Sequence, residues 1–315
     1  MKAATATLAS GQRVASVGNY FALLKPRVMS LVVFTGLAGM LVAPTAIDPF
    51  TAFTALLCIA VGAGASGALN MAYDSDIDQL MTRTATRPIP MGRIARGDAL
   101  GFGWTLAAGS LAVMALFVNL LAASLLAFTI GFYVFVYTLW LKRRTPQNIV
   151  IGGLAGALPP AIGWAAAAGS LALDPLVLVL IIFLWTPPHF WALSLYRSED
   201  YARAGVPMLP VARGKKAARR QIFVYALVLA PIGLVPAFIG LGGPLYAATA
   251  LGFGGWFVFD AWLVMRERDE TQEPAARRLF GVSILYLFAL FAGLIIEHLV
   301  GVPPLTTLSF GGWWA

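Results

Sequence analysis

The sequence predicts an all-α polytopic membrane protein with nine transmembrane helices. Hydrophobic residues fill 59% of the 315 positions and charged residues only 11%, and the apolar residues gather in long stretches. A soluble domain carries about 25% charged residues, whereas a transmembrane helix needs about 20 mostly apolar ones. The composition excludes a disordered chain and a nucleic-acid partner recognised by a basic face. The single cysteine, Cys58, excludes an internal disulfide framework.

The predicted spans follow one another along most of the chain. Residues 1–27 are expected to form a cytoplasmic amino-terminal segment, because they lack the compact apolar core of a signal peptide. Residues 28–300 form the nine-helix domain, and residues 301–315 a periplasmic tail. The nine spans are residues 28–47, 51–73, 99–117, 120–141, 149–169, 175–196, 221–241, 244–265 and 279–300.

Positive residues alternate from one connection to the next. All 22 Lys and Arg residues lie in the amino-terminal segment and the even-numbered connections. Because positive residues favour the cytoplasmic side, this distribution predicts a multi-pass inner-membrane protein, surrounded by lipid, with its amino terminus in the cytoplasm. It also supports nine spans, since one helix fewer would break the alternation. For most of these residues, setting the topology is a sufficient role.

Three oxygen-bearing side chains end the second predicted span at a spacing of four residues: Asn70, Asp74 and Asp78. In a helix this spacing places them on one face, while Asp76 points elsewhere. Two carboxylates about 6 Å apart repel by roughly 3 kcal/mol at an effective dielectric constant of about 20, so a compensating cation is expected. Hard oxygen ligands suit Mg²⁺, which shares carboxylates with substrate phosphates. The stripe predicts a metal-bridged diphosphate site, and the alternative is a solvated acidic helix end.

A second acidic cluster is predicted at the end of the sixth span, where Asp200 follows Glu199 and precedes Arg203. Four spans separate it from Asp74. An even number of spans returns the chain to the same membrane face, so the two clusters are expected to form two acidic corners with a diphosphate between them.

Basic side chains suited to phosphate follow both clusters, because arginine pairs with phosphate oxygens through two-point contacts. The loop after Asp78 is stiffened by Pro88 and Pro90. For the candidates that lie outside the segments after Asp78 and Asp200, namely Arg27, Lys142 and Arg143, the alternative role is to fix the membrane topology. The candidates are Arg27, Arg83, Arg87, Lys142, Arg143 and Arg203.

At these residues the chain resembles the UbiA superfamily of intramembrane prenyltransferases, and within it the branch that acts on heme. The resemblance runs from about residue 25 to the last span. The stretches that point to the heme branch are Thr145-Pro146-Gln147-Asn148 and Pro187-Pro188-His189-Phe190-Trp191. The superfamily marks are Asn70-x-x-x-Asp74-x-x-x-Asp78, Arg83-Thr84-x-x-Arg87-Pro88-Ile89-Pro90-x-Gly92-Arg93 and Asp200-Tyr201-x-x-Ala204-Gly205-Val206-Pro207.

The resemblance implies nine helices around a central cavity and Mg²⁺-dependent ionisation of farnesyl diphosphate. The farnesyl group would join a vinyl group of heme B, giving heme O and diphosphate, and a downstream heme A synthase is a candidate partner. The resemblance assigns Asp74, Asp78 and Asp200 to catalysis. It also assigns these three residues, together with Asn70, to metal binding. Much of the superfamily has two acids four residues apart in the second cluster. Here Tyr196 and Ala204 flank Asp200 at that spacing, so the number of metal ions stays open.

His189 lies near the middle of the sixth span, after two prolines expected to interrupt the helix. A polar ring at that depth is costly unless it faces a cavity or a partner. It is predicted either to contact heme iron or to form an internal hydrogen bond. At the far end of the last span, Glu297 and His298 are interpreted as a pair at the membrane interface.

Two other functions remain as alternatives. A prenyltransferase acting on an aromatic acid or quinone precursor would use the same acidic corners, but the Pro-Pro-His-Phe-Trp stretch argues against it. A secondary transporter built from parallel repeats would also contain buried acids. Transporter sites lie near the midplane, whereas these acids lie at span ends.

Overall fold

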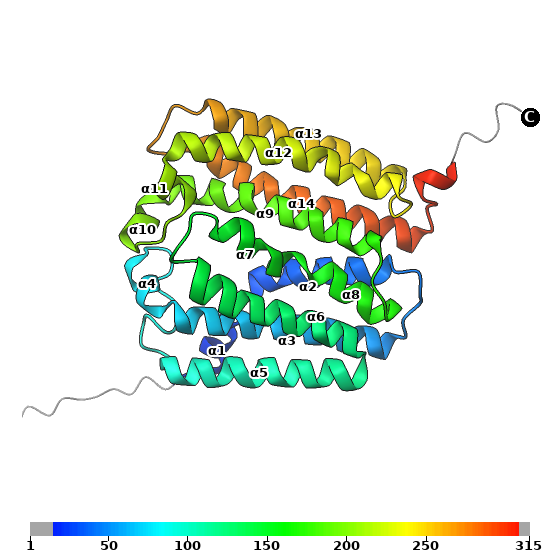
Figure 1. Ribbon diagram of the computed structural model, residues 1–315, viewed down its shortest axis with the longest axis horizontal. Coiled ribbons are helices and arrows are strands. Elements are labelled where there is room, and N and C mark those ends of the chain that lie inside the picture. The colour runs from blue at the N-terminus through cyan, green and yellow to red at the C-terminus, as the bar shows by residue number, and fades with distance from the viewer. Residues whose placement is uncertain (1–14, 309–315) are drawn as a thin grey trace, which may run out of the picture.

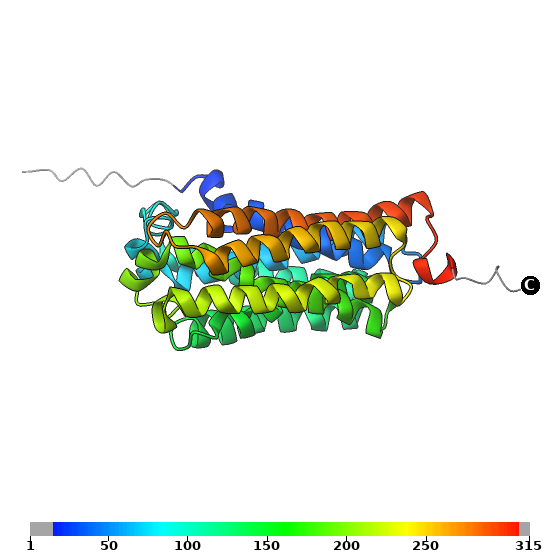
Figure 2. The ribbon, with the colours of Figure 1, turned by 90° about the horizontal axis from the view of Figure 1, so that it is seen from above.

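Long helices run back and forth along one direction in the computed structural model, which describes residues 15–308 (Figures 1 and 2). No strand occurs within that range. Eight helical segments between residues 49 and 300 are long and apolar enough to cross a membrane, and a bent pair at residues 17–41 makes nine if counted as one span. The prediction of an all-α polytopic membrane protein is therefore confirmed. The ends of the chain, including most of the predicted amino-terminal segment and residues 309–315 of the tail, lie outside the described residues.

The elements in chain order are α1 (Val17–Leu23), α2 (Pro26–Leu41), α3 (Pro49–Tyr73), α4 (Ser75–Leu80), α5 (Arg96–Phe117), α6 (Leu120–Gly131), the π-helix η1 (Phe132–Leu141), α7 (Asn148–Ala157), α8 (Pro159–Ala168), α9 (Leu173–Tyr196), α10 (Ser198–Arg203), α11 (Leu209–Arg213), α12 (Lys215–Phe238), α13 (Pro244–Arg266), α14 (Pro274–Val300) and the 3₁₀ helix η2 (Leu305–Leu308).

Several helix boundaries differ from the predicted spans. The first span was expected to reach residue 47, but α2 ends at Leu41 because Pro44 disfavours helix in the preceding residue. The segment before it contains α1, and α1 and α2 meet at an angle of 53°. The last span begins at Pro274, five residues early, because good helix formers such as Arg277 extend the helix beyond its apolar part.

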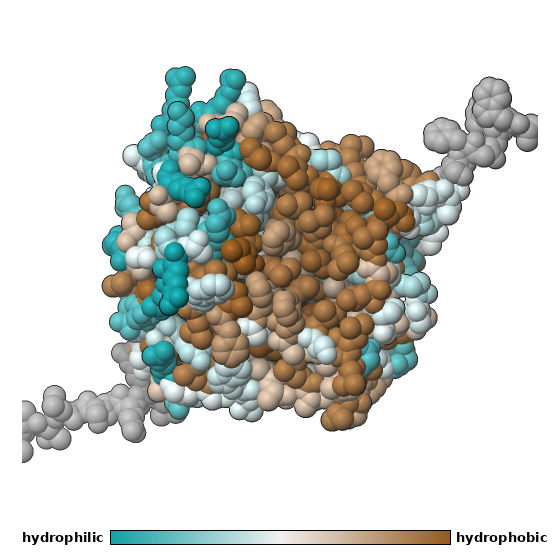
Figure 3. Space-filling view, in the orientation of Figure 1, coloured by the Kyte–Doolittle hydropathy of each residue, from teal (hydrophilic) through white to brown (hydrophobic). Residues whose placement is uncertain are grey.

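The short helices α4, α10 and α11 gather at one end of the bundle, which we call the α4–α10 end (Figure 1). Figure 3 shows hydrophilic residues concentrated at this end and hydrophobic residues across the middle of the visible face. That distribution fits a bundle surrounded by lipid, with water at its ends.

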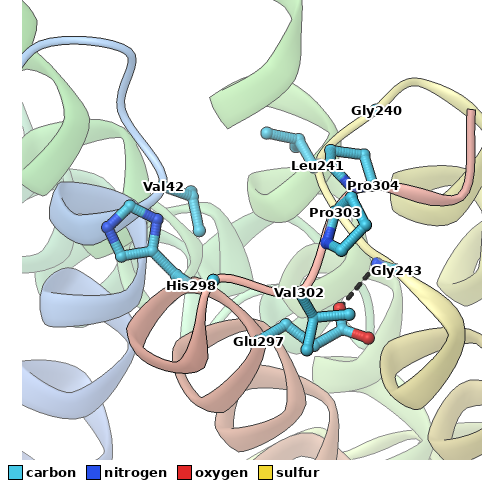
Figure 4. A pocket seen from close by; sticks show the side chains of 10 residues that line it. Val42, Gly240, Leu241, Gly243, Glu297, His298, Val302, Pro303 and Pro304 are labelled. Carbon is cyan, nitrogen blue, oxygen red and sulfur yellow. Dashed lines mark hydrogen bonds between the residues drawn. The ribbon is translucent and has the colours of Figure 1, made fainter. Parts of the chain in front are cut away.

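The opposite end of the bundle contains Glu297. Its carboxylate is buried and accepts hydrogen bonds from the backbone N–H groups of Gly243, at 2.6 Å, and Tyr246, at 2.9 Å (Figure 4). These N–H groups lie at the start of α13, where a helix lacks internal acceptors and favours negative charge. Glu297 lies near the end of α14, as expected, but its carboxylate is buried and joins α14 to α13. His298 is exposed and lies beside Val42.

Backbone contact between α2 and α8 requires glycine. A Cβ atom at Gly163 would lie 2.0 Å from the carbonyl oxygen of Gly36, and one at Gly39 would lie 2.1 Å from that of Pro160. Small residues permit this close approach in membrane helices.

Gly163→Ala is expected to lower the free energy of unfolding by about 1–3 kcal/mol, because the added methyl group forces two backbones apart. Thermal unfolding in detergent measures the effect. The control is Gly156→Ala on neighbouring α7, where a Cβ atom meets nothing within 4 Å. Equal unfolding temperatures for the two variants would contradict the packing argument.

Candidate active site

The stripe of oxygen-bearing side chains crosses the junction between α3 and α4. Asp74 ends α3 and precedes α4, with backbone angles of −92° and 6°. Helical hydrogen bonds nevertheless continue through it: the N–H of Asp74 donates to Asn70 O at 2.9 Å, and the N–H of Asp78 donates to Asp74 O at 2.8 Å. All three side chains are buried, and Asn70 Nδ2 donates to Asp74 Oδ2 at 2.7 Å. The spacing of four therefore does place the three residues together.

Protein cations compensate the carboxylates of this stripe. Lys142 Nζ pairs with Asp74 Oδ2, and Arg87 Nη1 lies 2.6 Å from Asp78 Oδ2. These two pairs balance part of the negative charge of Asp74 and Asp78. They also place two cations of the predicted phosphate-binding set directly at the stripe.

The second corner meets the first through the loop that follows α4. Asp200 is buried in α10, and its Oδ1 accepts a hydrogen bond from Thr82 Oγ1 at 2.9 Å. Arg203 pairs with the same carboxylate and donates to Thr82 Oγ1 at 3.0 Å. Glu199, the neighbouring acid, is exposed.

A buried apolar cluster holds the two corners side by side. It joins residues of α4 and its following turn to residues of α10 and the loop after it, with one residue from α7. Its members are Ile77, Met81, Ile149, Tyr201, Ala204, Val206 and Met208. The positions of the corners therefore depend on side chains from three separate parts of the chain.

The remaining predicted cations lie farther from the stripe. Arg143 forms a two-point contact with exposed Asp76, 2.7 Å to each carboxylate oxygen, and lies 3.7 Å from Asp74 Oδ1. The hydrogen bonds from Arg143 lower the pKa of Asp76 to about 2. Arg83 and Arg27 are exposed, and neither forms an ion pair within residues 15–308.

Two residues that the sequence analysis did not place in the site touch Asn70. Lys25 Nζ donates to Asn70 Oδ1 at 2.8 Å, and Asn70 Nδ2 donates to Thr138 Oγ1 at 3.1 Å. Lys25 follows α1 and was interpreted only as a topology signal, although a lysine between Leu24 and Pro26 at the entrance to a span is a usable clue. Thr138 lies in the π-helical η1, and a π-helix has no recognisable sequence pattern.

His189, a residue of α9, is buried among aromatic rings from α9 and α14. Its ring stacks between Trp185, at a centroid distance of 4.3 Å, and Phe280, at 4.4 Å. His189 Nδ1 lies 2.6 Å from Ser283 Oγ, and that hydroxyl donates to Phe280 O. When the Ser283 hydroxyl donates to Phe280 O, Nδ1 is the donor to Ser283 Oγ and the lone pair on Nε2 is left for a ligand; in the other tautomer the hydroxyl donates to Nδ1.

The internal hydrogen bond expected as one role of His189 is thus present, and contact with heme iron stays a prediction. The two prolines before it do not interrupt the helix: α9 is continuous from Leu173 to Tyr196. The hydrogen bond of His189 to Ser283 is therefore formed without a break in α9 at these prolines. Membrane helices tolerate proline when neighbouring groups satisfy the freed backbone.

Two buried carboxylate oxygens fit a divalent metal. Asp74 Oδ1 and Asp200 Oδ2 have no hydrogen-bond partner within the described chain, and both are hard donors of the kind Mg²⁺ prefers. No three His, Cys, Asp or Glu side chains between residues 15 and 308 group closely enough to hold a metal ion by themselves. Phosphate oxygens and water would therefore complete the coordination.

Buried acidic corners beside lysine and arginine, at one end of a membrane helix bundle, define an intramembrane site suited to a diphosphate and a divalent metal. The chain belongs to the UbiA prenyltransferase family, whose family model matches residues 32–285. A protein of Parvibaculum lavamentivorans named protoheme IX farnesyltransferase is 60% identical over 290 residues, covering 91% of each chain. A protein of Acidiphilium cryptum with the same name is 56% identical over 302 residues, covering 94% of this chain and 95% of the relative.

Solved structures share this fold at low sequence identity. A digeranylgeranylglyceryl phosphate synthase superposes with a TM-score of 0.72 at 19% identity, covering 89% of this chain and 99% of that protein. A UbiA homologue of Archaeoglobus fulgidus bound to GPP and Mg²⁺ superposes with a TM-score of 0.65 at 16% identity, covering 88% and 99%.

Proposed function

We propose that the chain transfers the farnesyl group of farnesyl diphosphate to a vinyl group of heme B, with addition of water, giving heme O and diphosphate. The observation that carries the proposal is the buried stripe of Asn70, Asp74 and Asp78 in a chain about 60% identical to proteins named for this reaction.

Mg²⁺ is the cofactor that fits the stripe and the second corner. The residues that would hold it are Asn70, Asp74, Asp78 and Asp200, and when bound it supplies positive charge that stabilises the departing diphosphate. The unpartnered oxygens of Asp74 and Asp200 support this assignment, as does the Archaeoglobus fulgidus homologue bound to GPP and Mg²⁺.

The cations at the α4–α10 end bind the diphosphate. Lys142 and Arg87 already point at the stripe through their ion pairs, so they stabilise developing negative charge without rearranging from water. Four arginines at the same end complete the set: Arg27, Arg83, Arg143 and Arg203.

The reaction breaks the allylic carbon–oxygen bond, the π bond of the heme vinyl group and one O–H bond of water, and it forms one carbon–carbon bond and one carbon–oxygen bond. The allylic carbon–oxygen bond breaks and its electron pair leaves with the diphosphate. The π electrons of the heme vinyl group form a bond to the farnesyl carbon. Water then adds to the cation left beside the porphyrin and loses a proton, which produces the hydroxyethylfarnesyl chain. The apolar interior of the bundle holds the farnesyl chain and restricts water.

The α4–α10 end is proposed to face the cytoplasm, with the protein in the inner membrane, because the positive residues of the connections gather there. A heme A synthase acting on the product is proposed as a partner.

The test is to incubate the purified protein with heme B, farnesyl diphosphate and Mg²⁺ and to identify the porphyrin by mass. We expect heme O, and no product when a chelator replaces the metal. An aromatic acid acceptor serves as the comparison substrate. Prenylation of that acceptor with heme unchanged would contradict the proposal.

Asp200→Asn is expected to lower kcat by about 10- to 100-fold, because the variant loses a charge at the diphosphate. Glu199→Gln changes the adjacent, exposed acid and is expected to leave kcat within twofold. If both variants lose activity equally, the buried carboxylate has no special role.

We also propose that His189 Nε2 contacts the heme iron, so His189→Ala is expected to change the absorption spectrum of bound heme. Ser283→Ala keeps the ring and removes its anchor at Nδ1, so a smaller shift is expected. Spectra are recorded with heme alone, without farnesyl diphosphate. An unchanged spectrum in His189→Ala at equal heme occupancy would exclude the ligand role.

A further inference from the structure

The π-helical segment η1 contacts the acidic stripe at two points that are four residues apart. Thr138, within η1, accepts a hydrogen bond from Asn70 Nδ2 at 3.1 Å, and Lys142, directly after η1, pairs with Asp74. Asn70 and Asp74 are also four residues apart, so the two elements meet in register. A π-helix is rare and is frequently found at functional sites. The proposed function uses Lys142 but gives no role to Thr138.

The amide of Asn70 has one orientation that all its neighbours accept. Lys25 Nζ can only donate, so the amide atom 2.8 Å from it is Oδ1. The ionised carboxylate of Asp74 can only accept, so the amide atom 2.7 Å from it is Nδ2. The second hydrogen of Nδ2 is left for Thr138. The Thr138 hydroxyl accepts this hydrogen and donates its own proton to Tyr133 O at 2.9 Å.

Burial makes the hydroxyl of Thr138 hard to replace. Thr138 is 1% exposed, Asn70 4% and Asp74 0%, so bulk water does not reach the amide. Without the hydroxyl, one amide hydrogen of Asn70 would be buried with no acceptor, which costs free energy. The amide would turn to recover a partner, and turning withdraws Nδ2 from Asp74.

The carboxylate of Asp74 depends in turn on that amide. Its Oδ2 is held from two sides, by Asn70 Nδ2 and by Lys142 Nζ. Its Oδ1 has no hydrogen-bond partner within the described chain, and Arg143 Nη2 lies 3.7 Å from it, beyond hydrogen-bonding distance. Oδ1 is the oxygen of this residue that fits a divalent metal. Its orientation is therefore set through Asn70 by Thr138.

We propose that Thr138 is a positioning residue of the reaction, which holds the amide of Asn70, and through it the carboxylate of Asp74, in the orientation that binds the metal and diphosphate. The inference rests on the proposed function, because it takes the metal to bind at the stripe. Groups that orient metal ligands change metal affinity by about 10- to 100-fold when they are removed. A purely structural threonine would change stability and leave metal affinity as it is.

The experiment removes the hydroxyl in two variants and keeps it in a third. Thr138→Val preserves the shape of the side chain, Thr138→Ala avoids placing a methyl group against Asn70, and Thr138→Ser retains the hydroxyl. Thr54→Val is the matched control, because Thr54 is also buried but its hydroxyl donates to Phe50 O in its own helix.

Each purified protein is titrated with the Mn²⁺ complex of inorganic diphosphate, and bound Mn²⁺ is measured by electron paramagnetic resonance. Mn²⁺ binds the same oxygen ligands as Mg²⁺. Thermal unfolding without metal confirms that each variant is folded. The Mg²⁺ concentration for half-maximal heme O formation and the KM for heme B are measured alongside.

We expect Thr138→Val and Thr138→Ala to weaken binding of the Mn²⁺ complex by about tenfold, and the required Mg²⁺ concentration to rise in parallel. Thr138→Ser and Thr54→Val should bind as the wild-type protein does, and the KM for heme B should not change. Wild-type affinity in folded Thr138→Val and Thr138→Ala overturns the inference, and so does an equal loss in Thr138→Ser.

The dependence on Asn70 is tested by combining substitutions. Asn70→Ala removes the amide, so adding Thr138→Ala should weaken binding of the Mn²⁺ complex no further. Additive losses would show that Thr138 acts independently of Asn70 and would overturn the inference. If the wild-type protein neither binds the complex nor makes heme O, the proposed function fails and this inference with it. If the wild-type protein does both and the Thr138 variants match it, the inference alone fails.

Discussion

Asp74→Asn is expected to reduce kcat by about 100- to 1000-fold, the range seen when one preorganised electrostatic contact is removed from an active site. Asp74 is fully buried, and its Oδ2 accepts from Asn70 and pairs with Lys142. Asparagine has the same size and keeps an oxygen for Lys142 but removes the charge. The measurement is heme O formation with saturating farnesyl diphosphate, heme B and Mg²⁺.

The control for this substitution is Asp98→Asn, which changes an exposed aspartate in the first turn of α5. Its kcat should remain within twofold of wild type. Thermal unfolding of both variants separates loss of chemistry from loss of folded protein. A folded Asp74→Asn enzyme with normal turnover would show that diphosphate ionisation does not use the stripe.

The general fold and the stripe could be predicted because each follows from local sequence. A bilayer admits only helices or closed barrels, so apolar stretches fix the spans of a chain like this one. Asn70, Asp74 and Asp78 are four residues apart, and the helical hydrogen bonds that run through Asp74 keep that register.

The partners of Asn70 could not be predicted because they come from distant segments. Lys25 is 45 residues from Asn70, and Lys142, which is 68 residues from Asp74, was predicted as a phosphate-binding residue but not as the partner of Asp74. The π-helix that places Thr138 beside Asn70 depends on packing around η1. α1 was also missed, since an apolar-stretch criterion overlooks a helix of seven residues.

Helix ends were mispredicted where charged residues continue a helix beyond its apolar part. α12 begins at Lys215, six residues before the predicted span. Its first turns carry Lys215 and Arg219, which contact the α13–α14 loop. A hydropathy criterion cannot detect this extension, because charged residues form it and charged residues lower the hydropathy of a predicted span.

Glu273→Gln is expected to lower the free energy of unfolding by about 3–5 kcal/mol, the cost of breaking a buried ion pair by removing one partner. Glu273 Oε1 lies 2.8 Å from Arg219 Nη2 and 3.2 Å from Lys215 Nζ, and both Glu273 and Arg219 are buried. The substitution leaves Arg219 without its nearest anion. Glutamine has nearly the same shape as glutamate. The left-handed backbone at this position, with φ of 48°, therefore contributes equally to the free energy of unfolding of both proteins.

The matched control is Glu270→Gln, in the same loop. Glu270 is mostly exposed and lies 3.7 Å from Arg219, so its loss should cost no more than about 1 kcal/mol. Thermal unfolding of both variants in the same detergent gives the comparison, and Arg219→Met with Glu273→Gln tests the pair. If the double variant is more stable than Glu273→Gln alone, the unpaired arginine causes the loss. Equal unfolding temperatures for Glu273→Gln and Glu270→Gln would contradict the argument, because burial is what distinguishes the two carboxylates.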